Sequence, residues 1–283
     1  MKTALIDERD DMALEVYRGG MRALQASGIP FLVGGAFALE IYCGVTRRTK
    51  DMDLFVRPEH AEPVLSSLSK SGYTTEMRFP HWLGKAFKDD HCIDVIFGSG
   101  NGISTVDGEW FAYAPTADVL DLAVRLVPPE EMIWSKAFIM ECARFDGGDI
   151  AHLLRGRGKS LDWSRLLRLF NGHWRILLSH LILFGFIYPG HRLLTPQWLM
   201  EELMRRVHRE MTCLPSDERL CQGTLLSWSE YLMDTDEGNY RDARLSPYGA
   251  LSLSETTRIT NTLSHERHNN GDTDERADPE RGT

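Results

Sequence analysis

The strongest pattern of apolar and polar positions in the chain consists of two short apolar runs separated by glycines and charges. Residues 29–33 form an apolar run without helical periodicity, which predicts a buried strand. Gly34 and Gly35 follow, and the next residues have the composition of a short helix that Gly44 ends. The apolar residues 54–56 predict a second strand. The pattern therefore predicts a strand, a glycine turn, a helix and another strand.

Two acidic residues open the second strand. Asp51 and Asp53 are two positions apart, so their carboxylates are expected to project from the same face of the strand. Two like charges held this close repel each other unless a cation lies between them. Mg²⁺ suits such a pair because it usually binds one or two carboxylates together with phosphate oxygens of a substrate.

The glycine turn predicts an anion site beside this pair. Backbone N–H groups at such a turn approach an anion closely, and the dipole of the following helix favours negative charge. The basic and hydroxyl residues Arg47, Arg48 and Thr49 lie between the helix and the two carboxylates. The alternative is an ordinary strand-to-helix turn followed by an exposed strand start.

Residues 31–56 resemble the nucleotidyltransferase signature of the DNA polymerase β-like superfamily. That signature is an apolar strand, Gly-Gly or Gly-Ser, a spacer, and Asp-x-Asp followed by apolar residues. The spacer between Gly35 and Asp51 is fifteen residues, towards the long end of the range in that superfamily. The resemblance implies an α/β (α+β) core with a mixed sheet, an NTP substrate and a third catalytic acid on a later strand.

Asp94 matches the place of that third acid. It lies in an otherwise apolar strand after a predicted hairpin. A carboxylate in such a strand is costly unless it is exposed, hydrogen-bonded or bound to a metal. The alternative is a solvent-facing residue on an edge strand.

A second polar block begins with Pro-Pro-Glu-Glu, which predicts the start of a helix over residues 131–142. Lys136, Arg144 and Asp149 resemble the downstream motifs of abortive-infection type nucleotidyltransferases, which include toxins of toxin–antitoxin pairs. The resemblance implies that Lys136 contacts nucleotide phosphate and that Asp149 supports catalysis. A Gly-Gly insert departs from the usual spacing and leaves Asp146 unassigned. The alternative is a surface lysine and an aspartate that caps a helix.

Other segments have weaker patterns. Residues 106–115 are expected to form a strand pair, and residues 119–127 fit either a strand or a helix. Residues 160–235 are expected to be helical, with the last helix over 220–233. We therefore expect a nucleotidyltransferase core over residues 1–127, a helical domain that closes the cleft over 128–250, and a polar, disordered tail over 251–283.

Composition limits the function classes. The net charge of −9 does not favour non-specific nucleic-acid binding, which depends on Lys and Arg. No apolar run reaches about 18 residues, so no transmembrane helix is predicted. The early acidic residues predict no signal peptide, and five scattered cysteines without a C-x-x-C pair favour reduced thiols in a cytoplasm.

The predicted reaction transfers an NMP from an NTP to a hydroxyl acceptor and releases pyrophosphate. Two Mg²⁺ ions would be held by Asp51, Asp53 and Asp94, of which Asp94 also helps to deprotonate the acceptor. The groups expected to hold phosphates are Gly34, Gly35, Arg47, Arg48, Thr49 and Lys136.

The identity of the acceptor stays open in the sequence. A toxin would modify tRNA or a protein and would have an antitoxin partner, whereas a drug-modifying enzyme would act on an aminoglycoside or a lincosamide. The acidic composition favours a cationic small molecule through electrostatic steering. A non-catalytic nucleotide-binding or partner-binding module is the alternative from another class, and the presence of all three acids argues against it.

Overall fold

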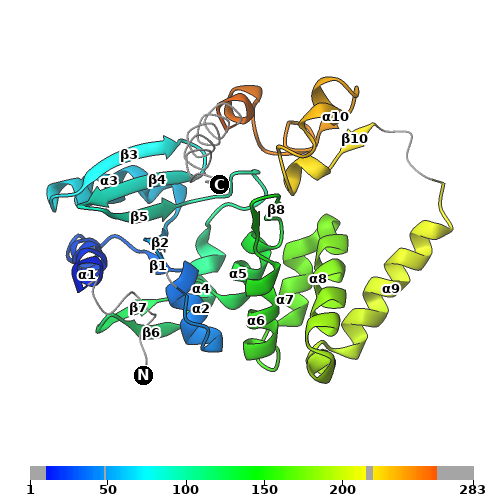
Figure 1. Ribbon diagram of the computed structural model, residues 1–283, viewed down its shortest axis with the longest axis horizontal. Helices are drawn as coiled ribbons and strands as arrows, with labels where there is room; N and C mark the ends of the chain where they lie inside the picture. Colours follow the sequence, from blue (N-terminus) through cyan, green and yellow to red (C-terminus); the bar gives the residue numbers. More distant parts are fainter. Residues whose placement is uncertain (1–10, 48, 215–218, 260–283) are drawn as a thin grey trace, which may run out of the picture.

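The computed structural model describes residues 11–47, 49–214 and 219–259. Its centre is a five-stranded mixed sheet with the strand order β1-β2-β5-β4-β3 (Figure 1). The strands are β1 (Leu32–Val33), β2 (Asp51–Phe55), β3 (Thr74–Phe79), β4 (Leu83–Lys88) and β5 (His91–Ile96). The pair β2 and β5 is parallel, and the other neighbouring pairs are antiparallel. The sheet and the helices around it confirm the predicted α/β class.

The neighbouring strands β2 and β5 present apolar side chains on one face of the sheet and polar side chains on the other. Helices α1 (Asp11–Ala26) and α3 (Ala61–Lys70) pack on each other and on the apolar face. Gly20 of α1 lies against β5, and an added Cβ at this position would be 2.4 Å from the Ile93 side chain. The close packing of α1 on the sheet therefore requires a residue without a side chain here. Because side chains alternate along a strand, burial of one set exposes the other set on the opposite face. The buried set is Met52, Leu54, Ile93 and Val95.

The segment after β5 corrects the expected strand pair over residues 106–115. It forms α4 (Gly108–Tyr113), because the Asp107 side chain accepts hydrogen bonds from two backbone N–H groups of the first turn. This N-cap outweighs the strand preference of the aromatic residues. The undecided segment 119–127 belongs to a hairpin of β6 (Thr116–Val119) and β7 (Leu122–Arg125).

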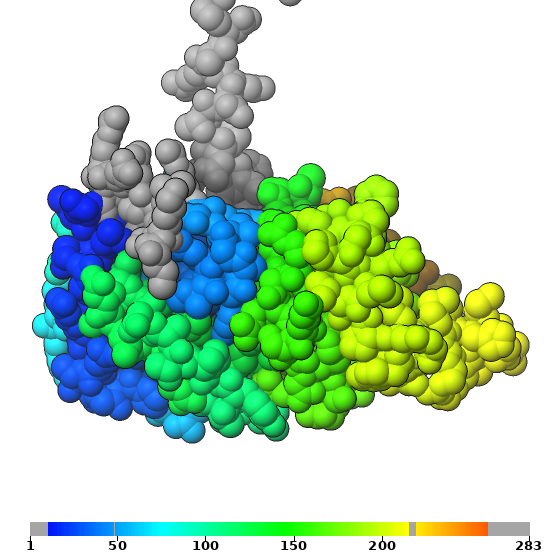
Figure 2. All heavy atoms as spheres, turned by 90° about the horizontal axis from the view of Figure 1, so that it is seen from below, coloured from blue at the N-terminus to red at the C-terminus, as the bar shows by residue number. Residues whose placement is uncertain are grey.

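The α-helices between residues 129 and 211 stand beside the sheet (Figure 1). They are α5 (Pro129–Lys136), α6 (Gly147–Arg157), α7 (Trp163–Phe170), α8 (Trp174–Ile187) and α9 (Gln197–Met211). The buried apolar cluster continues from the sheet through these helices, so the core is not interrupted at residue 127. Figure 2 shows the yellow α9 region at the end of the molecule away from α1. Within the described residues, no helix is long and apolar enough to cross a membrane.

The helix expected over residues 131–142 is shorter than predicted. It ends at Lys136, and the chain then forms a small hairpin of β8 (Met140–Glu141) and β9 (Arg144–Phe145). The hairpin satisfies backbone groups that a longer helix would have paired within itself. It also returns the chain to α6, so that residues after 144 lie next to Lys136.

The C-terminal region contains less helix than expected. Residues 220–233 do not form one helix. β10 (Leu220–Cys221) pairs with β11 (Arg241–Asp242), and the short 3-10 helix η4 (Gly223–Leu225) and α10 (Leu232–Asp236) lie between them. Leu251 and Ile259, from the expected tail, are buried against Phe79 and Leu83 of the sheet. Residues 260–283 lie outside the described residues.

Candidate active site

The polar face of β2 and β5 brings the three predicted acids together. Asp53 lies directly opposite Asp94 in the parallel register, and Asp51 lies opposite Cys92. All four side chains point away from the apolar face, since their neighbours along each strand are buried. The alternative of a solvent-facing Asp94 on an edge strand is wrong, because β5 is the central strand of the sheet.

The two glycines fit closely around the Asp53 side chain. The Gly34 N–H donates a hydrogen bond to the Asp53 carbonyl oxygen at 2.9 Å, which joins the turn to β2. Gly35 opens α2 (Gly35–Cys43) with a φ of +54°, and an added Cβ would lie 1.8 Å from Asp53 Oδ2. No other residue type fits at Gly35 without displacing this carboxylate.

Repulsion and burial raise the pKa of Asp53 to about 7. Burial is the largest cause, and the nearby carboxylates of Asp51 and Asp94 add to it. Lys136 and Arg144 act in the opposite direction, which places both cations within electrostatic range of Asp53. Asp53 is therefore a carboxylate that a bound cation would stabilise in its charged form.

Thr49 contacts a carboxylate in this structure. Its hydroxyl donates to Asp51 Oδ1 at 2.8 Å and lies at the same distance from the Asp51 carbonyl oxygen. The contact fixes the direction of the Asp51 side chain at the start of β2. Arg48, from the same expected phosphate-binding group, lies outside the described residues.

Asp94 has a partner that sequence reasoning did not assign. Lys85 of β4 lies opposite Asp94, and its ammonium is 2.7 Å from Asp94 Oδ1. The Cys92 thiol is 3.3 Å from the same oxygen. Burial and Asp94 raise the pKa of Cys92 to about 12, so the thiol keeps its proton and donates it. The signal that could have found it is the position of Lys85 in β4, on the same face of the sheet as Asp94 in the neighbouring β5.

The second block forms a chain of ion pairs that extends from this site. Lys136 lies 2.8 Å from both Asp146 and Asp149, and Arg47 lies 2.6 Å from Asp149 on its other side. Arg144 donates two hydrogen bonds of 3.0 Å to Asp146. Burial acts to lower the pKa of Lys136, but its two carboxylate partners raise it overall. Asp146, which the sequence left unassigned, is therefore a full member of this cluster.

The donor set around Asp53 fits a divalent cation. Among the residues the structure describes, no three His, Cys, Asp or Glu side chains form a ready-made metal cage. Mg²⁺ does not need one, because it commonly takes one or two carboxylates and completes its shell with water and substrate phosphates. Asp51 and Asp53 supply such a pair, and burial together with the neighbouring carboxylates raises the pKa of Asp53, so a cation there would stabilise its charged form.

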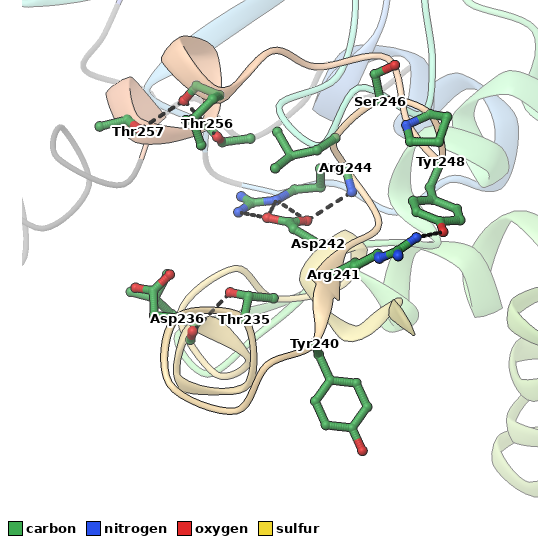
Figure 3. A pocket seen from close by; sticks show the side chains of 14 residues that line it. Thr235, Asp236, Tyr240, Arg241, Asp242, Arg244, Ser246, Tyr248, Thr256 and Thr257 are labelled. Atoms are coloured by element: carbon green, nitrogen blue, oxygen red, sulfur yellow. Dashed lines mark hydrogen bonds and ion pairs between the residues drawn. The ribbon is translucent and has the colours of Figure 1, made fainter. Parts of the chain in front are cut away.

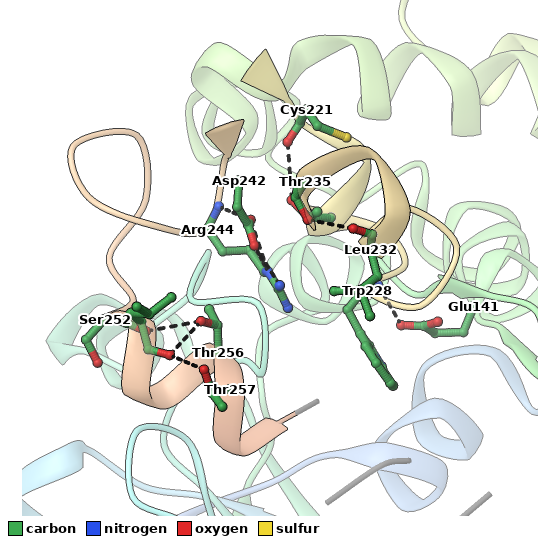
Figure 4. Close-up of polar contacts among 12 residues, drawn as sticks. Glu141, Cys221, Trp228, Leu232, Thr235, Asp242, Arg244, Ser252, Thr256 and Thr257 are labelled. Carbon is green, nitrogen blue, oxygen red and sulfur yellow. Dashed lines mark hydrogen bonds and ion pairs between the residues drawn. The ribbon is translucent and has the colours of Figure 1, made fainter. Parts of the chain in front are cut away.

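A cavity of about 630 Å³ lies elsewhere, in the C-terminal region. Figure 3 shows two pairs within its lining, Arg244 with Asp242 and Arg241 with the Tyr248 hydroxyl. Figure 4 shows the same region joined to β8, where Glu141 accepts a hydrogen bond from the Trp228 backbone. The cavity lies apart from the three acids and contains none of the predicted site residues.

Comparison with known proteins bears on the N-terminal part of the chain. Residues 20–101 match the family model described as aminoglycoside-2''-adenylyltransferase. No curated protein matches the chain.

Several solved structures are similar at low identity. The antibiotic-resistance factor ANT(2'')-Ia is 19% identical over 60% of this chain and 97% of its own, with a TM-score of 0.45. The lincosamide antibiotic adenylyltransferase LnuA is 13% identical over 49% of this chain and 94% of its own, with a TM-score of 0.37. A putative nucleotidyltransferase from Thermotoga maritima is 15% identical over 44% and 81%, with a TM-score of 0.36. Similarities of this size carry no argument about substrate.

The matched segment contains the glycine turn and all three acids. The family match thus supports the resemblance of residues 31–56 to the polymerase β-like nucleotidyltransferase superfamily.

Proposed function

We propose that this protein is a magnesium-dependent nucleotidyltransferase that moves an NMP from an NTP to a hydroxyl acceptor. The observation that carries the proposal is the row of Asp53 and Asp94 across β2 and β5, with Asp51 and the Gly34–Gly35 turn beside it. Oxygen donors and backbone N–H groups at one place suit a metal-bound triphosphate.

The residues take distinct roles in this reaction. Asp51 and Asp53 hold Mg²⁺, which supplies charge neutralisation at the phosphates when it is bound. The acceptor oxygen attacks the α-phosphorus, its proton passes to Asp94, and the bond to the pyrophosphate oxygen breaks. Lys136 and Arg144 lie within electrostatic range of Asp53 and offset the charge of the triphosphate.

The favoured acceptor is a cationic small molecule of the aminoglycoside type. The family match over residues 20–101 and the net charge of −9 both favour it. A lincosamide is the neighbouring possibility of the same class.

A toxin that modifies tRNA or a protein is the second candidate. The cluster of Lys136, Arg144 and Asp149 favours it, because these residues resemble the downstream motifs of abortive-infection nucleotidyltransferases. An antitoxin would then be a partner of this chain.

One experiment tests the reaction and separates the acceptors. Each α-³²P-labelled NTP is incubated with the protein, Mg²⁺ and one of three pools: aminoglycosides and lincosamides, total RNA, or lysate protein. We expect label transfer to the first pool, and transfer to RNA or protein would select the toxin function. Asp53→Asn is the matched inactive control. A folded protein that labels none of the pools with any NTP favours the non-catalytic nucleotide-binding alternative.

A further inference from the structure

Lys85 of β4 places a positive charge next to the acids Asp53 and Asp94 on the polar face of the sheet. The pairing registers place Lys85 opposite Asp94 and Asp94 opposite Asp53, so the three side chains lie side by side across three strands. The Lys85 ammonium is 2.7 Å from Asp94 Oδ1, and the two side chains are 25% and 14% exposed. An ion pair this short and this shielded from solvent is a fixed feature of the site rather than a loose surface contact.

The pairing is confined to one oxygen of Asp94. Oδ1 accepts from both the Lys85 ammonium and the Cys92 thiol. Within the described part of the chain, Oδ2 makes no hydrogen bond. Asp94, which lies opposite Asp53, therefore has one occupied and one free carboxylate oxygen.

We propose that Lys85 takes the place of one of the two divalent cations expected at this site. The ammonium neutralises Asp94, so a single divalent ion binds, at Asp51 and Asp53 with the triphosphate. This inference rests on the proposed nucleotidyltransferase function and specifies the metal count and the role of Asp94. The free Oδ2 is then the oxygen that receives the acceptor proton.

Electrostatics explains why a second ion is excluded. A divalent cation that bridged Asp53 and Asp94 would lie within a few ångströms of the ammonium, and the repulsion is large where solvent screens poorly. It would also have to displace Lys85 from its short contact with Oδ1. The single positive charge of Lys85 already balances the single negative charge of Asp94.

The test counts bound metal ions directly. Mn²⁺ binding is measured by the electron paramagnetic resonance of free Mn²⁺, with α,β-methylene-ATP and, in parallel, the GTP, CTP and UTP analogues. The wild type, Lys85→Arg, Lys85→Met and Lys85→Gln are compared after a circular-dichroism melt of each. We expect one ion per chain in the wild type and in Lys85→Arg, and two in the folded neutral variants.

Two ions in the wild type overturn the inference whether or not the variants fold. One ion in a folded Lys85→Met or Lys85→Gln also overturns it, since Lys85 then excludes nothing. If the wild type binds no Mn²⁺ with any analogue, or if Asp53→Asn leaves binding unchanged, the proposed function fails as well.

Discussion

Gly35 lies directly against the carboxylate of Asp53. A Cβ at Gly35 would be 1.8 Å from Asp53 Oδ2, and the residue has a φ of +54°. The glycine turn and the Asp-x-Asp strand are therefore a single unit, in which the turn is shaped around the side chain of the second acid. This contact explains physically why a glycine and an aspartate eighteen positions apart in sequence belong to one site.

The first prediction separates this contact from ordinary backbone strain. Gly35→Ala is expected to lower transfer activity about 100-fold or more, because displacing a reacting group by roughly 1 Å has an effect of that order. Gly44→Ala is the matched control, since Gly44 also has a positive φ, of +68°, but nothing lies within 4 Å of its Cβ position. Both variants should lose about 1–2 kcal/mol of stability from left-handed backbone strain. Equal activities for the two variants would contradict a specific role for Gly35.

The second prediction concerns the pH dependence of stability without metal. The folded pKa of Asp53 is raised from 3.8 to about 7, so its stabilisation is present below pH 3.8 and is lost as the pH rises through 7. Asp53→Asn should abolish transfer but raise the unfolding free energy of the metal-free protein at pH 8, by roughly 1–4 kcal/mol. The two proteins should converge near pH 4.

Mg²⁺ is the control for that prediction. It should raise the melting temperature of the wild type at pH 8 and leave that of Asp53→Asn nearly unchanged, because the ion needs the charged carboxylate. Melting curves with and without Mg²⁺ at pH 4, 6 and 8 measure both effects. A wild type that is more stable than Asp53→Asn at pH 8 without metal would show that Asp53 is not under electrostatic strain.

Local sequence patterns predicted the part of the site that local geometry determines. The apolar runs, the glycine turn and the two-residue spacing of Asp51 and Asp53 depend on strand alternation and chain reversal, and the structure contains them. Lys85 was missed because its role depends on which strands pair in the sheet, and strand order is a long-range property. Residues 137–142 were misassigned because helix and hairpin were both compatible with their composition, and contacts with distant residues such as Leu226 and Ser227 favour the hairpin.

The third prediction assigns Thr49 to metal positioning rather than to phosphate binding. Thr49→Val removes the hydroxyl that contacts Asp51 Oδ1 at 2.8 Å while keeping the shape of the side chain. We expect kcat to fall about 10- to 150-fold and the KM for NTP to change little, since a hydrogen bond to a charged carboxylate contributes about 1.5–3 kcal/mol. Thr49→Ser keeps the hydroxyl and should retain activity. A rise in KM with unchanged kcat would restore the phosphate-binding role.

The fourth prediction is about stability alone. Arg165 is buried between the carboxylates of Glu130 and Glu131, and its guanidinium lies 3.8 Å from the centre of the Tyr113 ring. Burial raises the pKa of Glu131 to about 7 although Arg165 acts against it. Arg165→Met would leave two buried carboxylates unpaired and should lower the unfolding free energy by about 3–5 kcal/mol.

The control for Arg165 is an exposed pair elsewhere in the helical part. Arg175 pairs with Glu210 at the surface, so Arg175→Met should change stability by less than about 1 kcal/mol. Adding Glu130→Gln and Glu131→Gln to Arg165→Met should recover part of the loss, because the buried charges are then removed. Denaturant unfolding of the four proteins gives the comparison. Equal losses for Arg165→Met and Arg175→Met would show that burial of the ion pair has no energetic effect.

The last prediction tests whether the Lys136 cluster belongs to the nucleotide site. Lys136 is 16% exposed and pairs with two carboxylates, whereas Arg47 is 45% exposed and pairs with Asp149. Lys136→Met should therefore cost about 3–5 kcal/mol of stability, and Arg47→Met about 1 kcal/mol or less. If Lys136 also contacts the triphosphate, its loss should raise the KM for NTP about 10- to 150-fold, which corresponds to about 1.5–3 kcal/mol for a charge-assisted contact. Lys136→Arg should recover most of both effects, since it keeps the charge. Thermal melts and binding of an NTP analogue measure the two quantities separately. A folded Lys136→Met protein that binds the analogue as tightly as the wild type would make the cluster a structural connection between α5 and α6.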